Sequence, residues 1–568
     1  MIKVKEKIPV ILLSFIILVS LIIYTYLFFT QKKSYNSDEI WSYALSNSYY
    51  CPFLEESENN IFETWITGET FHNYITVQKS QRFAYDSVWY NQAKDVHPPF
   101  YYAILHTICS FFPERFSPWF ALAINYVSFI GIMILLYKIG KKYCSSTFAL
   151  VLCAFYAFSC GAEDTFTFLR MYALCAFLAL FLFYEIDCYV SHRKKSTLFL
   201  LFICTLLSSL THYYLILFAF FLTAVCEVYF VIQRRGRDFF FLGFTMLISV
   251  ISAVIIFPSL LSHVLINDTF SKGALTVYTQ NKFILSLLTQ QFLGFSISIY
   301  HNMFFLYIGS FLVFAALILC ILCLLFRKEH FASKCFSKIK SLAVHMTKSM
   351  KDYFSTISIS YYILFFSLLC IYLFDVVNLP AAVMKEGTIR YLFPFYPLIC
   401  LFSLYIVNRM LQKIFCNYKT KLSIALILLC LFTFQSNLLS SHVFFYQKNE
   451  TYGQLISELP TDSYFILLTR NAWNISDFSL LLQTASYVYV VNERAYSQPC
   501  LPDTLSALPV SNTSKNIYLL FTETTPDNMK TNQTKWLSSF YNLPYVNELT
   551  LIGKDVVNGQ SVLLYILD

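Results

Sequence analysis

Charged residues are scarce in this chain of 568 residues. Asp, Glu, Lys and Arg together make up 13% of the sequence, whereas soluble globular proteins contain roughly 25%. Hydrophobic residues make up 57%, and the mean hydropathy is +0.57. This composition excludes an ordinary soluble protein and predicts a polytopic membrane protein.

The 17 cysteines show no zinc-binding spacing, and most of them lie inside apolar runs, where a thiol behaves as a small hydrophobe. Only Cys51 and Cys500 fall in segments that we place outside the membrane. A disulfide between them is conceivable, and the alternative is two unrelated thiols. The chain also shows no internal repeat and no low-complexity linker.

No small-residue cleavage site follows the first apolar run, Ile8 to Phe29. This run is also longer than the apolar region of a signal peptide, which spans about 7 to 15 residues. We therefore expect a retained first helix.

The basic residues, which give a formal net charge of +8, cluster in short segments between apolar runs. Such clusters are typical of cytoplasmic loops, so they predict membrane topology and no nucleic-acid partner. Runs of about 20 apolar residues thread between them, giving eleven predicted spans with the N-terminus inside and the C-terminus outside. The predicted spans cover residues 8–29, 118–138, 146–162, 170–190, a helical hairpin over 197–232, 239–258, 303–326, 358–377, 391–411 and 422–440.

The apolar segment from His97 to Phe112 is too short to be a further span. At 1.5 Å per residue it reaches only about 24 Å, against a hydrocarbon core of about 30 Å. Counting it as a span would also invert every basic loop that follows. We expect a helix that lies in or dips into the outer interface.

After Phe445 the composition changes to alternating polar and β-rich segments. The fold class predicted is an all-α polytopic membrane bundle with a small C-terminal extracytoplasmic α/β domain. The transmembrane domain is placed at residues 1–440, its first external loop with the interfacial helix at 31–117, and the α/β domain at 441–568. Strands are predicted over residues 463–469, 485–491, 516–521 and 561–567, and a helix over 453–458.

Ionisable residues other than the basic clusters gather at one level of the predicted bundle. A charge at the bilayer centre is costly, so its position along a bundle is informative. The inner loops are basic and nearly bare of acids, whereas a mixed set of acids, histidines and cations lies at the external helix ends, which indicates a site. This set comprises Asp38, Glu39, His97, Glu163, Asp164, Arg170, His212, Lys385, Glu386 and Arg390.

Five short motifs that carry many of these residues occur in a fixed order. They are Ser37-Asp38-Glu39, Asp95 to Tyr102 (DVHPPFYY), Leu169 to Leu174 (LRMYAL), Thr211 to Tyr214 (THYY) and Arg390 to Pro394 (RYLFP). Together they resemble the ordered motifs of bacterial GT-C glycosyltransferases, in particular the family-39-like set, which is similar to protein O-mannosyltransferases and lipid A aminoarabinose transferases. The resemblance covers roughly residues 1 to 440.

The resemblance implies transfer of a sugar from a polyprenyl-phosphate carrier to an extracytoplasmic acceptor, with inversion at the anomeric carbon. The acceptor would be a cell-envelope glycan, a lipid or a protein. Asp38 would be the general base that takes the proton of the acceptor hydroxyl, since a phosphate leaving group needs no protonation. Glu39 would orient the acceptor or Asp38; its alternative is an ordinary acid in the first turn of a helix.

Donor-phosphate binding is expected of His97, Arg170, Arg390 and Lys385. His97 precedes two prolines at the start of the interfacial helix, where free N–H groups favour an anion. Arg170 and Arg390 each begin a span on the external side, against the positive-inside preference, and a guanidinium can clamp a phosphate. The alternative for His97 is a histidine that only lies at the membrane interface. The alternative for Arg170 is an ion pair with Glu163 or Asp164.

Glu163, Asp164 and His212 are candidates for binding the acceptor or a metal. Carboxylates from this acidic pair and from Asp38 could hold Mg²⁺ or Mn²⁺, although the family does not clearly need a metal. His212 could instead only cap the helical hairpin.

The predicted location is a bacterial plasma membrane, with a cytoplasmic N-terminus and an extracytoplasmic C-terminal domain. The alternative function is a lipid-linked saccharide flippase or transporter, which would need polar groups along the whole transit path. A third reading is a membrane scaffold whose tail binds cell-wall glycan without needing Asp38.

Overall fold

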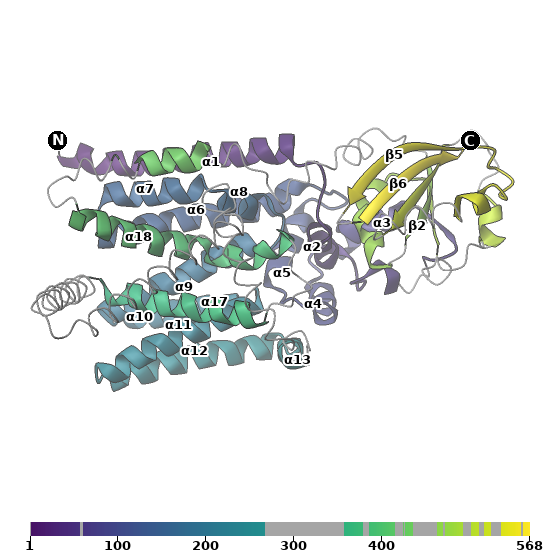
Figure 1. The fold of residues 1–568 in the computed structure, drawn as a ribbon. Coiled ribbons are helices and arrows are strands. Elements are labelled where there is room, and N and C mark those ends of the chain that lie inside the picture. The colour runs from purple at the N-terminus through teal and green to yellow at the C-terminus, as the bar shows by residue number, and fades with distance from the viewer. Residues whose placement is uncertain are drawn as a thin grey trace, which may run out of the picture.

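A bundle of long helices forms one end of the molecule and a curved β-sheet forms the other, in the computed structural model (Figure 1). The N-terminus lies at the far end of the bundle and the C-terminus beside the sheet. The structure describes residues 2–56, 61–266, 357–378, 386–414, 424, 427–435, 463–469, 472–491, 501, 503–509, 516–523, 536–557 and 560–567.

Six helices among the described residues are long and apolar enough to cross a membrane. The prediction of a polytopic helical membrane protein with a small C-terminal sheet is therefore confirmed. The long helices are α1 (Ile2–Gln31), α6 (Pro118–Tyr143), α9 (Tyr172–His192), α11 (Tyr213–Ile232), α12 (Gly236–Ile256) and the segment Arg390–Arg409, which combines the end of η6 (Glu386–Phe395) with most of α18 (Tyr396–Ile414).

Two further predicted spans correspond to shorter apolar helices, α10 (Lys195–Ser209) and α17 (Ile359–Asn378). The predicted span 303–326 lies outside the described residues, and 422–440 is described only in part. The number of eleven spans remains a prediction.

The prediction of one continuous helix over 146–162 is wrong, because the structure has two helices there with a break between them. Helix α7 (Ser146–Ala157) and helix α8 (Cys160–Thr167) are bent by 61° relative to each other. The Ser159 side chain accepts a hydrogen bond from the N–H of Ala162 and starts the second helix. Glu163 and Asp164 consequently lie inside α8, where both are buried, and not in an exposed external turn.

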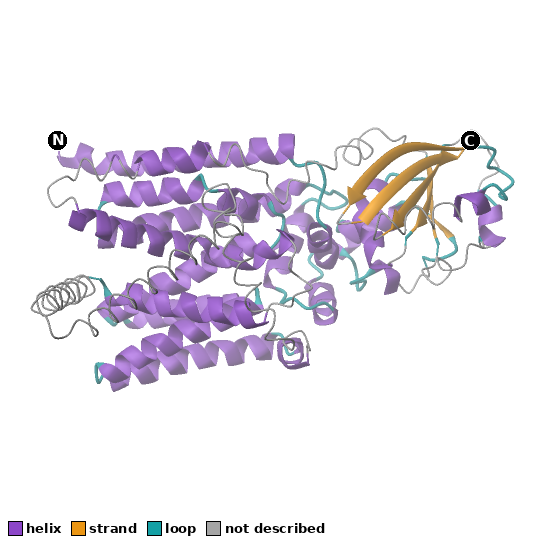
Figure 2. Cartoon of the chain, in the orientation of Figure 1, coloured by secondary structure: helices purple, strands orange, loops and turns teal. Residues whose placement is uncertain are grey.

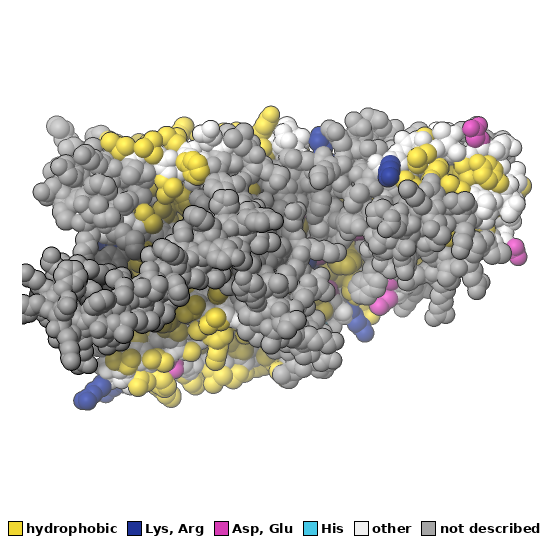
Figure 3. Space-filling model, viewed as in Figure 1, with side chains coloured by type: hydrophobic (Ala, Val, Ile, Leu, Met, Phe, Trp, Pro, Cys, Tyr) yellow, Lys and Arg dark blue, Asp and Glu magenta, His cyan; other side chains and the backbone are white. Residues whose placement is uncertain are grey.

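The outer surface of the bundle is apolar over helix α12. Phe240, Phe244, Leu247 and Ile255 are all more than half exposed, as expected of side chains that face lipid. Hydrophobic side chains likewise make up much of the described surface of the bundle on the face shown in Figure 3.

Short helices separate the bundle from the sheet (Figure 2). They lie in the segment between α1 and α6, which the sequence predicts to be the first external loop. They are α2 (Ser37–Asn47), α3 (Glu69–Ile75), α4 (Tyr85–Lys94) and α5 (Phe100–Phe111). Helix α5 is the predicted interfacial helix; at 12 residues it is too short to span a membrane.

The described sheet has six strands in the order β1-β3-β2-β4-β6-β5. Strand β2 pairs in parallel with β3 and β4, and its five residues are all buried, so it reads in the sequence as one continuous apolar run. All four predicted strands are confirmed as β2 (Tyr464–Leu468), β3 (Tyr487–Val490), β4 (Ile517–Glu523) and β6 (Gln560–Leu567), whereas β5 (Leu549–Val557) and β1 (Trp65–Ile66) were not predicted. The predicted helix 453–458 lies outside the described residues.

Strand β1 comes from the segment between α1 and α6, and it forms one edge of the C-terminal sheet. Trp65 is paired with Tyr489 of β3, and its indole N–H donates to the carbonyl of Ala507 at 3.0 Å. The segment between α1 and α6 and the C-terminal tail thus contribute strands to the same sheet. The boundary between residues 440 and 441 lies outside the described residues and remains a prediction.

Candidate active site

Helix α2 begins with a capping box that places two acids in its first turn. The Asn36 side chain accepts a hydrogen bond from the N–H of Asp38 at 2.9 Å, and the Glu39 carboxylate accepts one from the N–H of Asn36 at 2.8 Å. This reciprocal pattern ties the Glu39 carboxylate back to the helix start. The two neighbouring acids therefore have different surroundings.

Glu39 is fully buried and holds three segments together. Its Oε1 accepts from the Lys32 ammonium at 2.7 Å and from the N–H of Leu169 at 2.8 Å. These contacts join the end of α1, the start of α2 and the turn before α9. The arrangement fits the alternative of an acid that stabilises the first turn of a helix.

Asp38 instead faces a cluster of cations. Its Oδ2 lies 2.8 Å from an Arg390 guanidinium nitrogen, and its backbone carbonyl accepts from Arg170 Nη1 at 2.9 Å. Burial alone would raise the pKa of Asp38, but the charges of Arg390 and Arg170 outweigh burial and lower that pKa below its usual value of 3.8. Asp38 is thus ionised at neutral pH.

His97 is held by a carboxylate two residues before it. Its Nδ1 lies 2.9 Å from Asp95 Oδ2, and the two side chains are 19% and 11% exposed. The burial of Asp95 favours the neutral acid, but His97 lowers the pKa of that carboxyl below its usual value overall.

The loop that carries His212 is pinned to the start of α5. The N–H of Phe100, just after the two prolines, donates to the carbonyl of Leu210 at 2.8 Å. This bond brings the rings of His97 and His212 to a centroid distance of 5.8 Å. Two motifs more than 100 positions apart therefore meet at one place.

His212 presents a buried donor to this place. It is the N-cap residue of α11, and its Nδ1 accepts from the N–H of Tyr214 at 3.1 Å. Burial, together with the charges of His97, Arg170 and Arg390, lowers the pKa of His212 well below 6.5, so the ring is neutral. A neutral ring whose Nδ1 accepts must carry its proton on Nε2. This Nε2 is buried and has no hydrogen-bond partner among the described residues.

Three other donors around Asp38 are also buried without a partner in the described ranges of the chain. They are Arg170 Nε, Arg390 Nε and the Tyr102 hydroxyl. Arg170 also lies over the Tyr102 ring, with its guanidinium carbon 5.7 Å from the ring centroid. Unsatisfied buried donors are rare in native structures and costly, so their concentration here indicates a place for an anion.

The structure therefore brings together five of the predicted site residues. Asp38, His97, Arg170, His212 and Arg390 form one cluster, which we call the external cluster. Glu39 is engaged with Lys32, and Lys385 lies outside the described residues. Glu163 and Asp164 lie within α8, where Asp164 Oδ2 is 3.9 Å from the Cys160 sulfur.

The residues present do not fit the Mg²⁺ or Mn²⁺ ion that the sequence left open. In the part of the chain that the structure describes, no three His, Cys, Asp or Glu side chains come together as a ligand group. Asp38 forms an ion pair with Arg390, and this guanidinium would compete with a metal cation for the carboxylate.

Asp95 contacts the external cluster through His97 and was not selected as a candidate from the sequence. It lies in the DVHPPFYY motif, but no role followed from the motif alone. Its spacing of two residues from His97, with prolines fixing the chain after it, was the available signal.

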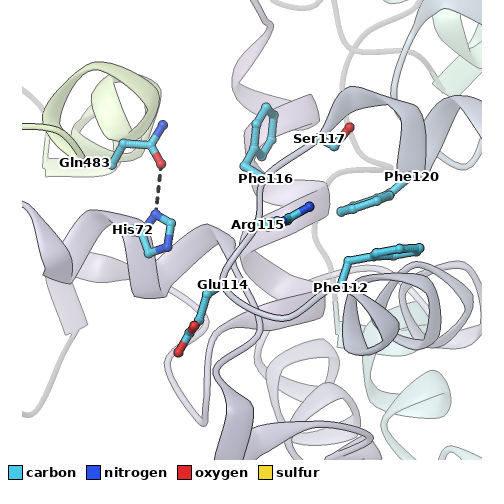
Figure 4. A pocket seen from close by; sticks show the side chains of 8 residues that line it. All are labelled: His72, Phe112, Glu114, Arg115, Phe116, Ser117, Phe120 and Gln483. Carbon is cyan, nitrogen blue, oxygen red and sulfur yellow. Dashed lines mark hydrogen bonds between the residues drawn. The ribbon is translucent and has the colours of Figure 1, made fainter.

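A separate cavity of about 650 Å³ opens where the α5–α6 connection meets the sheet domain (Figure 4). His72 of α3 and Gln483 form one wall, joined by a 3.2 Å hydrogen bond, and the rings of Phe112 and Phe120 stack on the other side. None of the residues that line this cavity belongs to the external cluster.

Comparisons with known proteins give one kind of likeness. No protein-family model and no curated protein matches the chain. Among solved structures, ArnT from Cupriavidus metallidurans in the apo state is similar over 97% of both chains, with a TM-score of 0.49 and 10% identity. The same protein bound to undecaprenyl phosphate is similar over 97% of both chains, with a TM-score of 0.44 and 12% identity.

ArnT is a lipid A aminoarabinose transferase, one of the groups whose ordered motifs this chain resembles. With TM-scores below 0.5 and so little sequence identity, the likeness by itself carries no inference about activity. An inference about activity therefore rests on the external cluster.

Proposed function

We propose that this protein is an integral-membrane glycosyltransferase that moves a sugar from a polyprenyl-phosphate donor to an extracytoplasmic acceptor. One observation carries the proposal. In the part of the chain that the structure describes, four buried donors without a partner lie around an ionised carboxylate at one end of a membrane bundle. A phosphate that enters laterally with its lipid would satisfy those donors, and the carboxylate would remain beside the sugar.

Arg170, Arg390 and His212 would bind the donor phosphate. A guanidinium binds phosphate through charge-assisted hydrogen bonds, and the neutral His212 adds a donor on Nε2. The phosphate would compete with Asp38 for Arg390 and so weaken the 2.8 Å ion pair. Donor binding would thereby release the carboxylate that the reaction needs.

Asp38 would act as the general base. As the acceptor oxygen attacks the anomeric carbon, the bond from that carbon to the phosphate oxygen breaks and the acceptor proton passes to Asp38. The departing negative charge stays on the phosphate, where the arginines stabilise it. A single displacement of this kind inverts the anomeric carbon.

Glu39 would position Asp38 by fixing the start of α2, and would not touch substrate. Glu163 and Asp164 would support the bend between α7 and α8. Lys385 remains proposed as a further phosphate contact. The acceptor is proposed to be a cell-envelope glycan, lipid or protein, and the location a bacterial plasma membrane with the external cluster on the outside.

The test is sugar transfer by Asp38→Asn in proteoliposomes supplied with radiolabelled polyprenyl-phosphate sugars and an envelope fraction. We expect transfer by wild type and almost none by Asp38→Asn, with both proteins folded equally well. Equal transfer by the variant would refute the mechanism. Movement of labelled lipid between leaflets without transfer would favour the flippase instead.

A further inference from the structure

Asp95 and His97 form a buried pair at the edge of the external cluster. Asp95 is the C-cap residue of α4, where its N–H donates to the carbonyl of Asn91 at 3.0 Å. Its Oδ2 lies 2.9 Å from His97 Nδ1. A carboxylate that accepts from Nδ1–H fixes both the tautomer and the orientation of an imidazole.

The other ring nitrogen of His97 is consequently turned away from Asp95. The His97 ring lies beside His212, with the two ring centroids 5.8 Å apart, and among the described residues the His212 Nε2 has no hydrogen-bond partner. The backbone fixes the place of the His97 ring, because His97 precedes Pro98 and the chain is then anchored through Phe100 to Leu210.

We propose that Asp95 is a positioning residue, which holds His97 so that Nε2 contacts the phosphate of the donor lipid. The inference rests on the proposed function and deepens it, since His97 alone carries two rotatable bonds and could turn away from the site. With Asp95 in place, the ring is preorganised before the lipid arrives.

In a competing account, Asp95 affects the site only through its negative charge and does not position His97. Asp95 also lies within electrostatic reach of Asp38 and Arg170. If that were its only influence, removing the negative charge would make the site more attractive to an anion. The two accounts thus predict opposite signs for Asp95→Ala.

The experiment is a double-mutant cycle on the full chain in nanodiscs, with undecaprenyl phosphate as the probe. We expect His97→Ala to raise the Kd about tenfold, as loss of one charge-assisted hydrogen bond does. Asp95→Ala should raise it about fivefold to tenfold alone, but less than twofold in the His97→Ala background.

Asp95→Asn keeps a side-chain oxygen that accepts from Nδ1–H, so it should bind within threefold of wild type or more tightly. Asp86→Ala is the matched control, because Asp86 lies in the first turn of α4, at the end opposite Asp95, and its carboxylate accepts from the Tyr50 hydroxyl. It should leave the Kd unchanged.

The outcomes separate the two proposals. If wild type does not bind undecaprenyl phosphate, the proposed function fails. If wild type binds but Asp95→Ala tightens binding, or weakens it equally with and without His97, the positioning role is refuted and the proposed function stands. An unchanged Kd for His97→Ala also overturns the positioning role, and thermal unfolding of each variant identifies any loss that comes from misfolding.

Discussion

Two buried polar clusters lie near opposite ends of helix α9 and differ in whether their charged groups are satisfied. Near one end, Asp187 accepts from the Lys142 ammonium at 2.8 Å, from the Ser360 hydroxyl at 2.6 Å and from the Tyr143 hydroxyl. At the other end, the external cluster leaves Arg170 Nε, Arg390 Nε and His212 Nε2 without partners.

The comparison shows what each cluster can do. The buried carboxylate of Asp187 accepts hydrogen bonds from three donors, so its hydrogen-bonding needs are met within the protein. This cluster is therefore expected to stabilise the fold. Buried donors without acceptors lower the free energy of unfolding, and this loss is offset only when an anion binds and accepts their hydrogen bonds. Burial and charge alone do not separate the two clusters; hydrogen-bond satisfaction does.

Asp38→Asn should sharpen the comparison most. Loss of a general base costs about 10²–10⁴-fold in rate, so transfer should fall by at least a hundredfold while the affinity for undecaprenyl phosphate stays the same or improves. Single-turnover transfer and binding measured on one preparation check this. A variant with near wild-type turnover would remove the external cluster from the chemistry.

Asp187→Ala should act in the opposite way. Its loss removes the buried acceptor that Lys142, Tyr143 and Ser360 share, which costs about 3 kcal/mol of unfolding free energy. Thermal unfolding should shift clearly downward, whereas the Kd for undecaprenyl phosphate should stay within twofold. A strong loss of affinity in protein that is still folded would contradict the structural role.

His212→Ala should weaken binding of undecaprenyl phosphate about fivefold to tenfold, since one hydrogen-bond donor to a charged group is lost. His212→Gln, which keeps an N–H donor, should lose less. The pair of variants is compared by their Kd at pH 7. Equal losses in both would mean that the ring acts by its shape and not by its donor.

The pH dependence should show the smallest effect. Because the folded pKa of Asp38 lies below 3.8, the carboxylate stays ionised as the pH falls from 7, and protonates only when the pH falls through that lowered pKa. The kcat/KM for the donor, which reports the free enzyme, should have no limb due to Asp38 above about pH 4. A limb near pH 6 that disappears in Asp38→Asn would contradict this assignment.

Much of the fold follows from the sequence, because long apolar runs and basic loops dictate spans directly. The predicted span 118–138 became α6, and 239–258 became α12, within a few residues. The bend between α7 and α8 did not follow, because the Ser159 cap is one polar residue in an apolar run. Strand β1 did not follow either, since two residues pair only with a partner more than 400 positions away.

The residues of the external cluster were selected from the sequence, but their contacts could not be predicted from it. Asp38, Arg170 and Arg390 were placed at one level of the bundle by topology alone, and the structure adds that they touch. The separation of Glu39 from Asp38 depends on the capping box with Asn36, whose spacing of three residues was visible in the sequence. The role of Asp95 needed the 2.9 Å contact with His97.

The most direct test of the external cluster as a lipid-phosphate site is the affinity of undecaprenyl phosphate for wild type, Arg170→Gln, Arg390→Gln and Lys142→Gln in nanodiscs. Arg170→Gln and Arg390→Gln should each raise the Kd at least tenfold, because each removes a charge-assisted contact with the phosphate. Lys142→Gln removes a cation from the satisfied cluster and should leave the Kd unchanged. Equal affinity in all four proteins would contradict the account.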